Sequence, residues 1–524
     1  MCGIFAAIHS PYSIEELTPS VQAIQHRGPD DTQIAHVNAS TILGFHRLAI
    51  NDLSAAGNQP MSHPDHPHLK LVCNGEIYNY RQLAATFGVK LSSGSDCEII
   101  LHLYHLLGMA ETCRLLDGYF AFVLVDGERV FAARDVIGVR SLYIGSRVDA
   151  TYFASELKAI HSLCDSVSQF PPGTWWDGNS FHLYHDLYEK KFHKPSEADA
   201  IASIRQLLEN AVEKRVDTTE RPIGCLLSGG LDSSVICALV NQYTLKKTGK
   251  PVHTFSIGFE GSTDCRYARR VAEHLGTVHH EVLVTPQDMI QAIPEVVRAI
   301  ESYDTTTVRA STPMYLLCKY INQHTDIKVI FSGEGSDELS GSYLYFHHAP
   351  NEEEFYQETQ RLMRDLSYFD VLRCDKSTAA HGLEVRVPFL DLAFMQYYLH
   401  LDPVMKMPKT YGIEKHLLRK ACEDLLPSEV AWRVKEAFSD GVSSVENSWF
   451  TIIQRHVETL PESLSLKERV YEVNPPQMKE SAWYRRVYEE AYPGRERLTP
   501  YYWLPKWVGE VTDPSARILK VYTK

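Results

Sequence analysis

An apolar strand, a loop of glycine and serine, and the start of a helix follow one another directly between residues 223 and 235. The segment reads Ile-Gly-Cys-Leu-Leu-Ser-Gly-Gly-Leu-Asp-Ser-Ser-Val. Glycine amides, serine hydroxyls and the positive end of the helix would point at one place, which suits an anion such as pyrophosphate. The segment lacks the P-loop lysine and the G-x-G-x-x-G pattern, so neither γ-phosphate transfer nor a dinucleotide fold is indicated. A helix-capping serine turn is the structural alternative.

The periodicity of apolar residues changes near residue 195. Before it, short β-runs alternate with Gly, Pro and Asn, as at Gly3 to Ile8 and Thr41 to Arg47. After it, Ala200 to Val216 has helical spacing, and a compact strand ending at Leu227 follows, which favours a parallel α/β sheet. The sequence therefore predicts a strand-rich domain over residues 1–195 and an α/β domain over residues 196–524. Two cores are expected because one core seldom grows beyond about 250 to 300 residues.

Charge and composition exclude several classes of protein. The net charge of −14 disfavours non-specific binding to nucleic acid or to an anionic membrane. No run of about 18 apolar residues is present to cross a bilayer, and the first 20 residues lack the pattern of a secretory signal. The 11 cysteines have no C-x-x-C spacing and lie mostly in apolar stretches, so most of them are expected to be reduced core residues. We expect a soluble, cytoplasmic protein.

Cys2 is the exception among the cysteines, because removal of Met1 would leave it at the N-terminus. A thiol with a pKa of about 8.5 would then lie beside an α-amine with a pKa of about 7.7 to 8.0, and the amine could take the thiol proton near neutral pH. Cys2 is therefore a candidate nucleophile. Taken alone, a cysteine at the second position is more often accidental.

A cysteine that attacks an amide needs donors for the developing oxyanion. Asn74 and Gly75 could supply a side-chain amide and a backbone N–H, although Asn-Gly is also a common hairpin turn. An amino-acid substrate needs a cation for its carboxylate and anions for its ammonium group. Arg47 suits the first role, and Glu76 and Asp96 suit the second.

Five motifs in order make the N-terminal half resemble the class II glutamine amidotransferases. They are Cys2-Gly3-Ile4, His26-Arg27-Gly28-Pro29-Asp30, Arg47-Leu48-Ala49-Ile50, Asn74-Gly75-Glu76-Ile77-Tyr78-Asn79 and Gly94-Ser95-Asp96. The resemblance implies an α+β N-terminal-nucleophile fold, an αββα sandwich, with Cys2 as nucleophile and Asn74 and Gly75 as the oxyanion hole. It also implies a set of glutamine-binding residues: Arg47, Leu48, Ala49, Ile50, Asn51, Asn74, Gly75, Glu76 and Asp96.

The Ser-Gly-Gly-Leu-Asp-Ser-Ser string resembles the pyrophosphate loop of the ATP pyrophosphatases, which cleave ATP between its α- and β-phosphates. By this resemblance Asp232 would hold Mg²⁺. Ligands of open α/β sheets collect at the carboxyl ends of strands, which adds Leu227 and Ile257 as candidates for contact with adenine. The expected ATP-binding residues are Leu227, Ser228, Gly229, Gly230, Asp232, Ser233, Ser234, Ile257, Ser332 and Gly333.

A further strand, residues 329–331, leads into an acidic turn that extends to Glu338. Three carboxylates beside bound phosphates make sense if Asp337 helps to hold Mg²⁺ and Glu334 acts as a base or organiser for an incoming amine. A solvated acidic loop is the alternative. For a dicarboxylic amino acid the sequence offers Thr306, Thr307, Arg309 and Arg386. Lys435 is the expected cation for charge on the α-phosphate.

Taken together, these segments resemble the asparagine synthetases over nearly the whole chain. The resemblance implies a ligase that uses glutamine, aspartate and ATP with Mg²⁺ as cofactor, and it is compatible with a homodimer. One departure is Ser340-Gly341-Ser342-Tyr343, where glycine is expected immediately before the tyrosine. Two alternatives stay open: another adenylating amidotransferase on the same two-domain plan, such as a β-lactam synthetase, and a non-catalytic glutamine or nucleotide sensor.

Overall fold

The computed structural model describes residues 1–434, 441–443, 448–460, 471–509 and 511–514. The chain divides into two compact units. Unit 1 consists of Met1–Glu189, Thr218–Pro222 and Thr378–Glu384, and unit 2 of Lys190–Asp217, Ile223–Ser377 and Val385–Lys524. The chain thus passes into unit 2 after Glu189 and returns twice to unit 1 for short stretches. Each unit has its own sheets and core.

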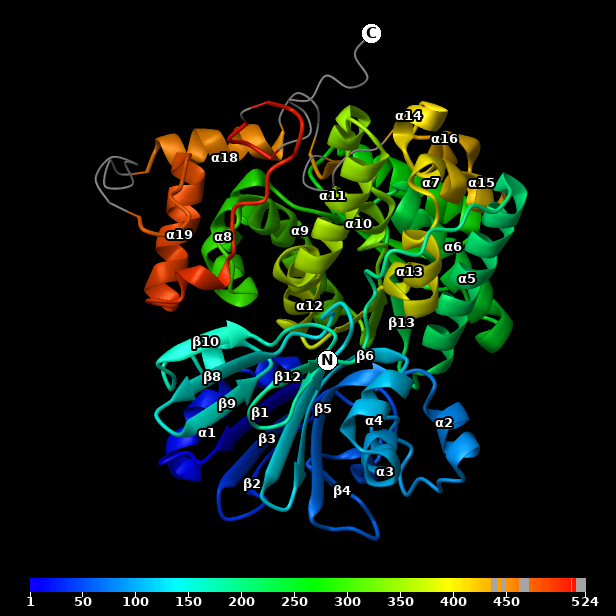
Figure 1. Cartoon of the computed structure of the whole chain (residues 1–524). Helices are drawn as coiled ribbons and strands as arrows, with labels where there is room; N and C mark the ends of the chain where they lie inside the picture. Colours follow the sequence, from blue (N-terminus) through cyan, green and yellow to red (C-terminus); the bar gives the residue numbers. More distant parts are fainter. Residues whose placement is uncertain (435–440, 444–447, 461–470, 510, 515–524) are drawn as a thin grey trace. The chain divides into compact units, whose positions relative to one another are not determined.

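Unit 1 contains two six-stranded sheets (Figure 1). The first has the strand order β10-β8-β9-β1-β3-β2 and the second β12-β11-β7-β6-β5-β4. Their bounds are β1 Gly3–Ile8, β2 Asp31–His36, β3 Thr41–Arg47, β4 Met61–Ser62, β5 Leu69–Ile77, β6 Gly118–Asp126, β7 Arg129–Arg134, β8 Tyr143–Arg147, β9 Ala150–Ala154, β10 Ser166–Gln169, β11 Thr174–Trp176 and β12 Phe181–Leu183.

The two sheets pack face to face between layers of helices. One core cluster lies between the sheets and joins residues such as Ile4 and Phe45 of the first sheet to Val72 and Val123 of the second. A second cluster fills the space between the second sheet and its helices, α2 Tyr80–Phe87, α3 Glu98–Leu107 and α4 Met109–Leu115. Helix α1, Ile14–Gln22, packs on the outer side of β2 and β3. The order of layers is α, β, β, α, which confirms the expected N-terminal-nucleophile sandwich.

Two strands of this sandwich carry the residues that the sequence singled out. β1 begins one residue after Cys2 and lies between β3 and β9. β5 carries Asn74 and Gly75 opposite Ala121 and Phe120 of β6. A side chain at Gly75 would have its Cβ 2.4 Å from the carbonyl oxygen of Tyr119, so only glycine fits this close pairing.

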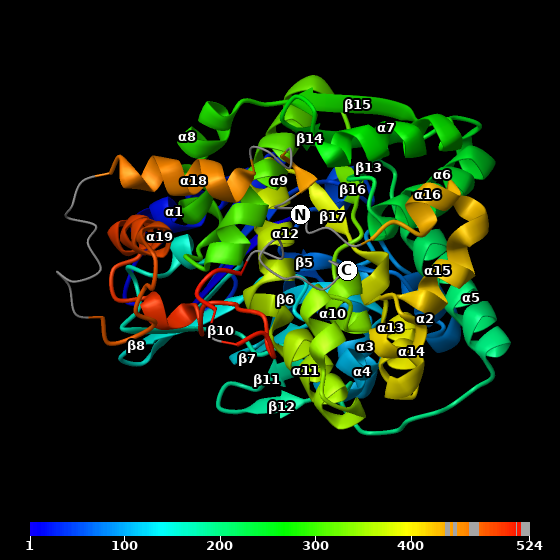
Figure 2. The ribbon, with the colours of Figure 1, turned by 90° about the horizontal axis from the view of Figure 1, so that it is seen from above.

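Unit 2 is built around a five-stranded sheet with the order β15-β14-β13-β16-β17. The strands are β13 Ile223–Leu226, β14 His253–Gly258, β15 Val278–Leu283, β16 Val329–Phe331 and β17 Glu384–Arg386. β13 pairs in parallel with both β14 and β16, and β14 with β15. Figure 2 shows α5 Glu197–Asp217 and α6 Leu231–Thr248 on one side of the sheet, and α8 Pro286–Ile300 and α9 Thr305–His324 on the other. This arrangement confirms the expected parallel α/β domain.

The strand order places a switch point between β13 and β16. From β13 the chain moves outward to β14 and β15 and then returns to the other side of β13 to form β16. In open α/β sheets the loops at such a point diverge and leave a crevice at the carboxyl ends of the strands. The loops that start at Leu227 and Ser332 follow these two strands and therefore border the same crevice.

The other helices of four or more residues in the described part of the chain belong to unit 2, except for the last two residues of α12, which belong to unit 1. They are α7 Thr263–Leu275, α10 Ser336–Ser340, α11 Glu352–Asp365, α12 Asp370–Ala379, α13 Leu392–Leu399, α14 Pro408–Tyr411, α15 His416–Cys422, α16 Ser428–Ala431, α18 Trp449–Glu458 and α19 Lys479–Ala491. Among the helices that the structure describes, none combines the length and the apolar character needed to span a bilayer.

Candidate active site

Cys2 is held in place at the start of β1 by groups from two other segments. Its thiol lies 3.7 Å from the carbonyl oxygen of Leu48. The Nε of Arg27 donates to the carbonyl oxygen of Cys2 at 2.9 Å, and Arg27 is itself buried in an ion pair with Glu156 at 2.6 Å. The backbone at the candidate nucleophile is therefore fixed by a charged side chain.

Met1 precedes Cys2 in the structure and is buried. Its sulfur accepts a contact from Nη1 of Arg140 at 2.8 Å. Burial lowers the pKa of the Met1 amino group to about 6 and raises the pKa of the Cys2 thiol to about 11. In a chain that keeps Met1 this thiol is therefore protonated at neutral pH. The free α-amine of such a chain is that of Met1, so Cys2 has no α-amine of its own to take the thiol proton.

Asn74 is fully buried, and neither atom of its side-chain amide has a hydrogen-bond partner among the described residues. Burying an amide without a partner costs about 1 to 3 kcal/mol, so such a group is rarely kept without a reason. A donor held ready for a negative charge on a substrate supplies one.

Two of the expected glutamine-binding residues, Glu76 and Asp96, converge on the side-chain amide of a third, Asn51. The Nδ2 of Asn51 donates to Glu76 at 2.8 Å and to Asp96 at 3.2 Å. Burial raises the pKa of Asp96 to about 6, although the backbone N–H of Ile77 donates to it at 2.6 Å. Two carboxylates that reach the same donor can also reach the ammonium group of an amino acid.

The segment from Arg47 to Ile50 is tied down by hydrogen bonds. Nη1 of Arg47 donates to the carbonyl oxygen of Ser54 at 2.6 Å and to Oδ1 of Asn58 at 2.5 Å, and Nη2 contacts the carbonyl of Asp52. The N–H of Ala49 donates to Asp30 at 2.8 Å, and the carbonyl of Ile50 accepts from Glu220 at 3.1 Å. The sequence proposed Arg47 for a carboxylate, and here its guanidinium supports the loop from residue 52 to residue 58.

Unit 2 contains a cavity at the switch point between β13 and β16. Eight of the ten expected ATP-binding residues line it: Leu227, Ser228, Gly230, Asp232, Ser233, Ile257, Ser332 and Gly333. Glu334, Asp337 and Thr306 line it as well. Gly229 and Ser234 are not among the lining residues. Gly229 instead makes the turn, with a φ of +73°, and its Cα packs so closely that a Cβ would lie 2.4 Å from the N of Ala268.

The conformation of the glycine–serine loop is stabilised by hydrogen bonds from its backbone to the hydroxyls of its own serines. The N–H of Ser228 donates to Oγ of Ser233 at 3.2 Å, and the N–H of Gly230 donates to Oγ of Ser228 at 3.3 Å. Gly333 approaches the start of α6 so closely that a Cβ would lie 2.7 Å from the N of Ser233. The two loops at the switch point are therefore in backbone contact.

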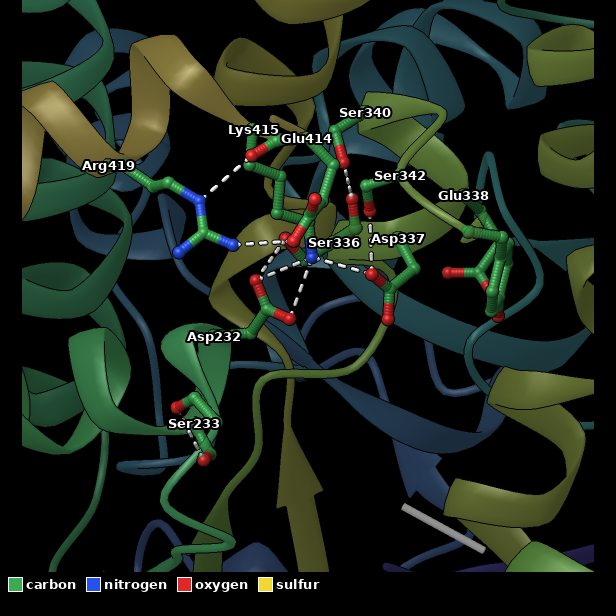
Figure 3. Close-up of polar contacts among 12 residues, drawn as sticks. Asp232, Ser233, Ser336, Asp337, Glu338, Ser340, Ser342, Glu414, Lys415 and Arg419 are labelled. Carbon is green, nitrogen blue, oxygen red and sulfur yellow. Dashed lines mark hydrogen bonds and ion pairs between the residues drawn. The ribbon is translucent and has the colours of Figure 1, made fainter. Parts of the chain in front are cut away.

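Lys415 joins the two expected magnesium ligands (Figure 3). Its Nζ lies 2.7 Å from both carboxylate oxygens of Asp232 and 2.6 Å from Oδ1 of Asp337. The lysine side chain is 1% exposed. Its backbone has a φ of +59°, a strained conformation for a residue with a side chain and one that is often found at functional sites. Two carboxylates that share one cation suit Mg²⁺, which commonly takes one or two carboxylates together with phosphate oxygens.

A second cluster of charged side chains, formed by Glu334, Asp370 and Arg373, lies in the wall of the same cavity. Nη2 of Arg373 lies 2.5 Å from Glu334, and its Nε donates to Asp370 at 2.7 Å. Nη1 of Arg373 is buried and has no hydrogen-bond partner among the described residues. All three side chains line the cavity. Burial raises the pKa of Glu334, and the nearby Arg373 opposes this shift.

Of the four residues expected to bind aspartate, Thr306 lines the cavity and the other three lie outside it. Asp304 caps α9, and its carboxylate accepts from the N–H of Thr307 at 2.8 Å and from the Thr307 hydroxyl at 2.7 Å. Arg309 is buried between Glu480, at 2.6 Å, and Asp513, at 2.8 Å. Arg386 is buried, and its guanidinium contacts the carbonyl of Arg215. None of these three lines the cavity. Lys435 lies outside the described residues.

Several charged residues that line the cavity were not predicted from the sequence: Asp264, Asp370, Arg373, Glu414, Lys415, Arg419 and Arg433. Arg373 could have been noticed from its i,i+3 spacing to Asp370 on a helix. Lys415 offers no local signal, because it lies 183 residues beyond Asp232 in the chain.

Matches to two family models agree with this division of sites. The model of the asparagine synthase family matches residues 203–358 and 349–510, and that of the glutamine amidotransferase domain matches residues 1–177. The chain is 46% identical to an asparagine synthetase [glutamine-hydrolyzing] of Gallus gallus and 45% identical to that of Homo sapiens, with 100% of this chain and 99% of each relative covered. A solved glutamine phosphoribosylpyrophosphate amidotransferase from B. subtilis resembles 53% of this chain and 81% of its own at 17% identity, with a TM-score of 0.31.

Proposed function

Because this chain belongs to the family of glutamine-hydrolysing asparagine synthetases, we propose that it makes asparagine from aspartate, ATP and the amide nitrogen of glutamine. The products are asparagine, glutamate, AMP and pyrophosphate. Unit 1 releases ammonia from glutamine, and unit 2 consumes it.

In unit 1 the Sγ of Cys2 attacks the side-chain amide carbon of glutamine. The amine of a Cys2 freed from Met1 takes the thiol proton and passes it to the leaving nitrogen as the C–N bond breaks. Asn74 and the N–H of Gly75 donate to the oxyanion, while Glu76 and Asp96 hold the ammonium group of the substrate. Water then hydrolyses the thioester to glutamate and restores the thiol.

In unit 2 the side-chain carboxylate of aspartate attacks the α-phosphorus of ATP, and the bond to the β-phosphate oxygen breaks. Asp232 and Asp337 would hold Mg²⁺, which neutralises phosphate charge when it is bound. Ammonia then attacks the acyl carbon of β-aspartyl-AMP, and AMP leaves. Glu334, which lines the cavity, accepts the proton that the nitrogen loses. The role of Lys435 on the α-phosphate stays a prediction.

The substrate aspartate needs a cation in the cavity, and we assign this role to Arg373. Its Nη1 is buried without a hydrogen-bond partner among the described residues, in a wall that also carries Glu334. The carboxylate of an amino acid would satisfy that N–H. Thr306, which also lines the cavity, can add a hydroxyl.

The observation that carries the proposal is the convergence of Asp232 and Asp337 on one point at the switch between β13 and β16. The test is the Cys2→Ala variant, assayed for AMP and asparagine with either glutamine or ammonium as nitrogen source. Glutamine-dependent synthesis should vanish, and ammonium-dependent synthesis should persist. Release of ADP in place of AMP by the wild-type protein, or loss of both activities in Cys2→Ala, would contradict the proposal.

A cytoplasmic location, the absence of membrane and nucleic-acid partners, and a homodimer belong to the same proposal. Cell fractionation, nucleic-acid binding assays and light scattering coupled to size-exclusion chromatography would test them in turn.

A further inference from the structure

We propose that Ser342 is a positioning residue that fixes the carboxylate of Asp337 for the divalent cation of unit 2. This inference rests on the proposed function, because it concerns the same cation site. Ser342 lies where the family resemblance predicts glycine. A glycine at this position would have no side chain, so the hydroxyl of Ser342 is an addition in this chain and is not required to form the turn.

Ser342 binds Asp337 twice. Its backbone N–H donates to the carbonyl oxygen of Asp337 at 3.1 Å, and its Oγ donates to Oδ1 of the same residue at 2.6 Å. Nζ of Lys415 reaches that same oxygen at 2.6 Å. Figure 3 shows the hydroxyl and the ammonium group approaching the carboxylate from different directions. Two donors from different segments thus restrain one carboxylate oxygen.

The hydroxyl of Ser342 is a strong donor in this position. The residue is fully buried, so water does not compete readily for its hydrogen bond. A short O–H bond to a carboxylate is charge-assisted and stronger than a bond between neutral groups. The neighbouring carboxylate has a matching contact, because Oγ of Ser336 donates to Oδ1 of Asp232 at 2.8 Å.

The backbone shows why serine is tolerated at position 342. Gly341 has a φ of +59° and ends α10, and a Cβ there would lie 2.6 Å from the ring of Phe355. Ser342 is not among the residues with positive φ. The turn therefore requires glycine only at position 341, and the side chain at 342 is free to serve the carboxylate.

Groups that orient metal ligands commonly change metal affinity by about 10- to 100-fold when they are removed. We expect Ser342→Ala and Ser342→Gly to raise the Mg²⁺ concentration for half-maximal AMP formation about tenfold, with ammonium as nitrogen source. The kcat at saturating Mg²⁺ should change less, because Ser342 does not touch substrate. Both variants are made so that, if one of them fails to fold, the other still tests the role of the Ser342 hydroxyl.

Ser340→Ala is the matched control. Ser340 lies on the same turn and is also buried, but its hydroxyl donates to the backbone carbonyl of Ser336 at 2.6 Å. Removing that hydroxyl should leave the Mg²⁺ requirement unchanged. A shift in Ser340→Ala as large as in Ser342→Ala would mean that any disturbance of the turn suffices, and would overturn the inference.

A second readout does not depend on turnover. Binding of Mn²⁺, followed by electron paramagnetic resonance in the presence of α,β-methylene ATP, should weaken about tenfold in the Ser342 variants and not in Ser340→Ala. Unchanged Mn²⁺ binding would overturn the inference even if activity fell. If the wild-type protein forms no AMP, the proposed function fails, and the Mn²⁺ measurement still decides the role of Ser342.

Discussion

Arg373 directs Nη2 at Glu334 across 2.5 Å while its Nη1 has no hydrogen-bond partner among the described residues. A buried guanidinium that is only partly satisfied by its own protein is suited to bind a carboxylate from outside. The pair therefore combines a candidate base with a candidate substrate-binding cation.

The first prediction separates Arg373 from Arg309 as the aspartate-binding residue. Arg373→Lys keeps the charge but loses the fork of N–H donors, so the KM for aspartate should rise about tenfold or more while the KM for ATP changes little. Arg309→Lys should lower the melting temperature, because it disturbs a buried pair with Glu480 and Asp513, and should leave the KM for aspartate unchanged. The measurement is steady-state kinetics of both variants. A raised KM for aspartate in Arg309→Lys but not in Arg373→Lys would favour Arg309, as predicted from the sequence.

The second prediction concerns Asn74. Asn74→Ala should lower kcat for glutamine hydrolysis about 10²- to 10³-fold, the effect of removing one oxyanion donor. The melting temperature should not fall, because the amide makes no hydrogen bond with described residues that could be lost. Asn79→Ala is the control, since the Asn79 amide bonds to Leu115 at 2.8 Å and Asp117 at 3.1 Å. It should lose stability and keep most of its kcat; a stability loss in Asn74→Ala would argue that its amide is structural.

The third prediction concerns Met1. A protein that retains Met1 should not hydrolyse glutamine at neutral pH, because its Cys2 thiol, with a pKa of about 11, is ionised only to about one part in ten thousand at pH 7. Ammonium-dependent synthesis should be unaffected. Mass spectrometry gives the fraction of chains that begin at Cys2, and glutaminase activity should scale with it. Full activity in a preparation that retains Met1 would rule out the amine-activated thiol.

The fourth prediction concerns acid stability of unit 1. The ring of His63 lies 4.8 Å from His66, 4.4 Å from His102 and 5.5 Å from His105 between ring centroids. Burial, followed by these neighbours, lowers the pKa of His63 from 6.5 to about 4. The unfolded chain then binds a proton more readily than the folded one between these values, so stability should fall as the pH drops from 6.5 toward 4.

Urea unfolding at pH 7.5 and pH 5.0 measures this effect. His63→Gln cannot take up a proton, so its midpoint should fall less between the two pH values than that of the wild-type protein. His9→Gln is the control, because His9 is exposed. Its substitution should leave the difference in midpoint between the two pH values as in the wild-type protein. An equal acid-induced loss in wild type and His63→Gln would contradict the assignment.

Much of the fold followed from local patterns. The glycine–serine segment lies between an apolar strand and a helix, as the sequence predicted, because glycine freedom and helix capping act over a few residues. The strand-end residues Leu227 and Ile257 line the same cavity, because parallel strands bring their carboxyl ends to one edge. The switch in periodicity near residue 195 also reflects a local property, the spacing of apolar side chains.

The expected aspartate residues show where local patterns fall short. Arg309 and Thr307 occur in a segment with suitable chemistry, yet Arg309 pairs with the distant Glu480, and Thr307 bonds to Asp304, the N-cap of its own helix. Which face of a helix meets the cavity depends on how that helix packs against distant segments. The sequence of α9 alone does not contain that information.

By itself the sequence determined the two domain types, the candidate nucleophile, the glycine–serine loop and the acidic turn, because each depends on residues that are neighbours in the chain. Only the tertiary structure brought Lys415 to Asp232 and Asp337, left Nη1 of Arg373 without a described partner at the cavity wall, and gave the hydroxyl of Ser342 its carboxylate. The physical reason is that charge pairing and burial depend on distance in space, and packing joins groups whose separation in the chain carries no signal of their contact.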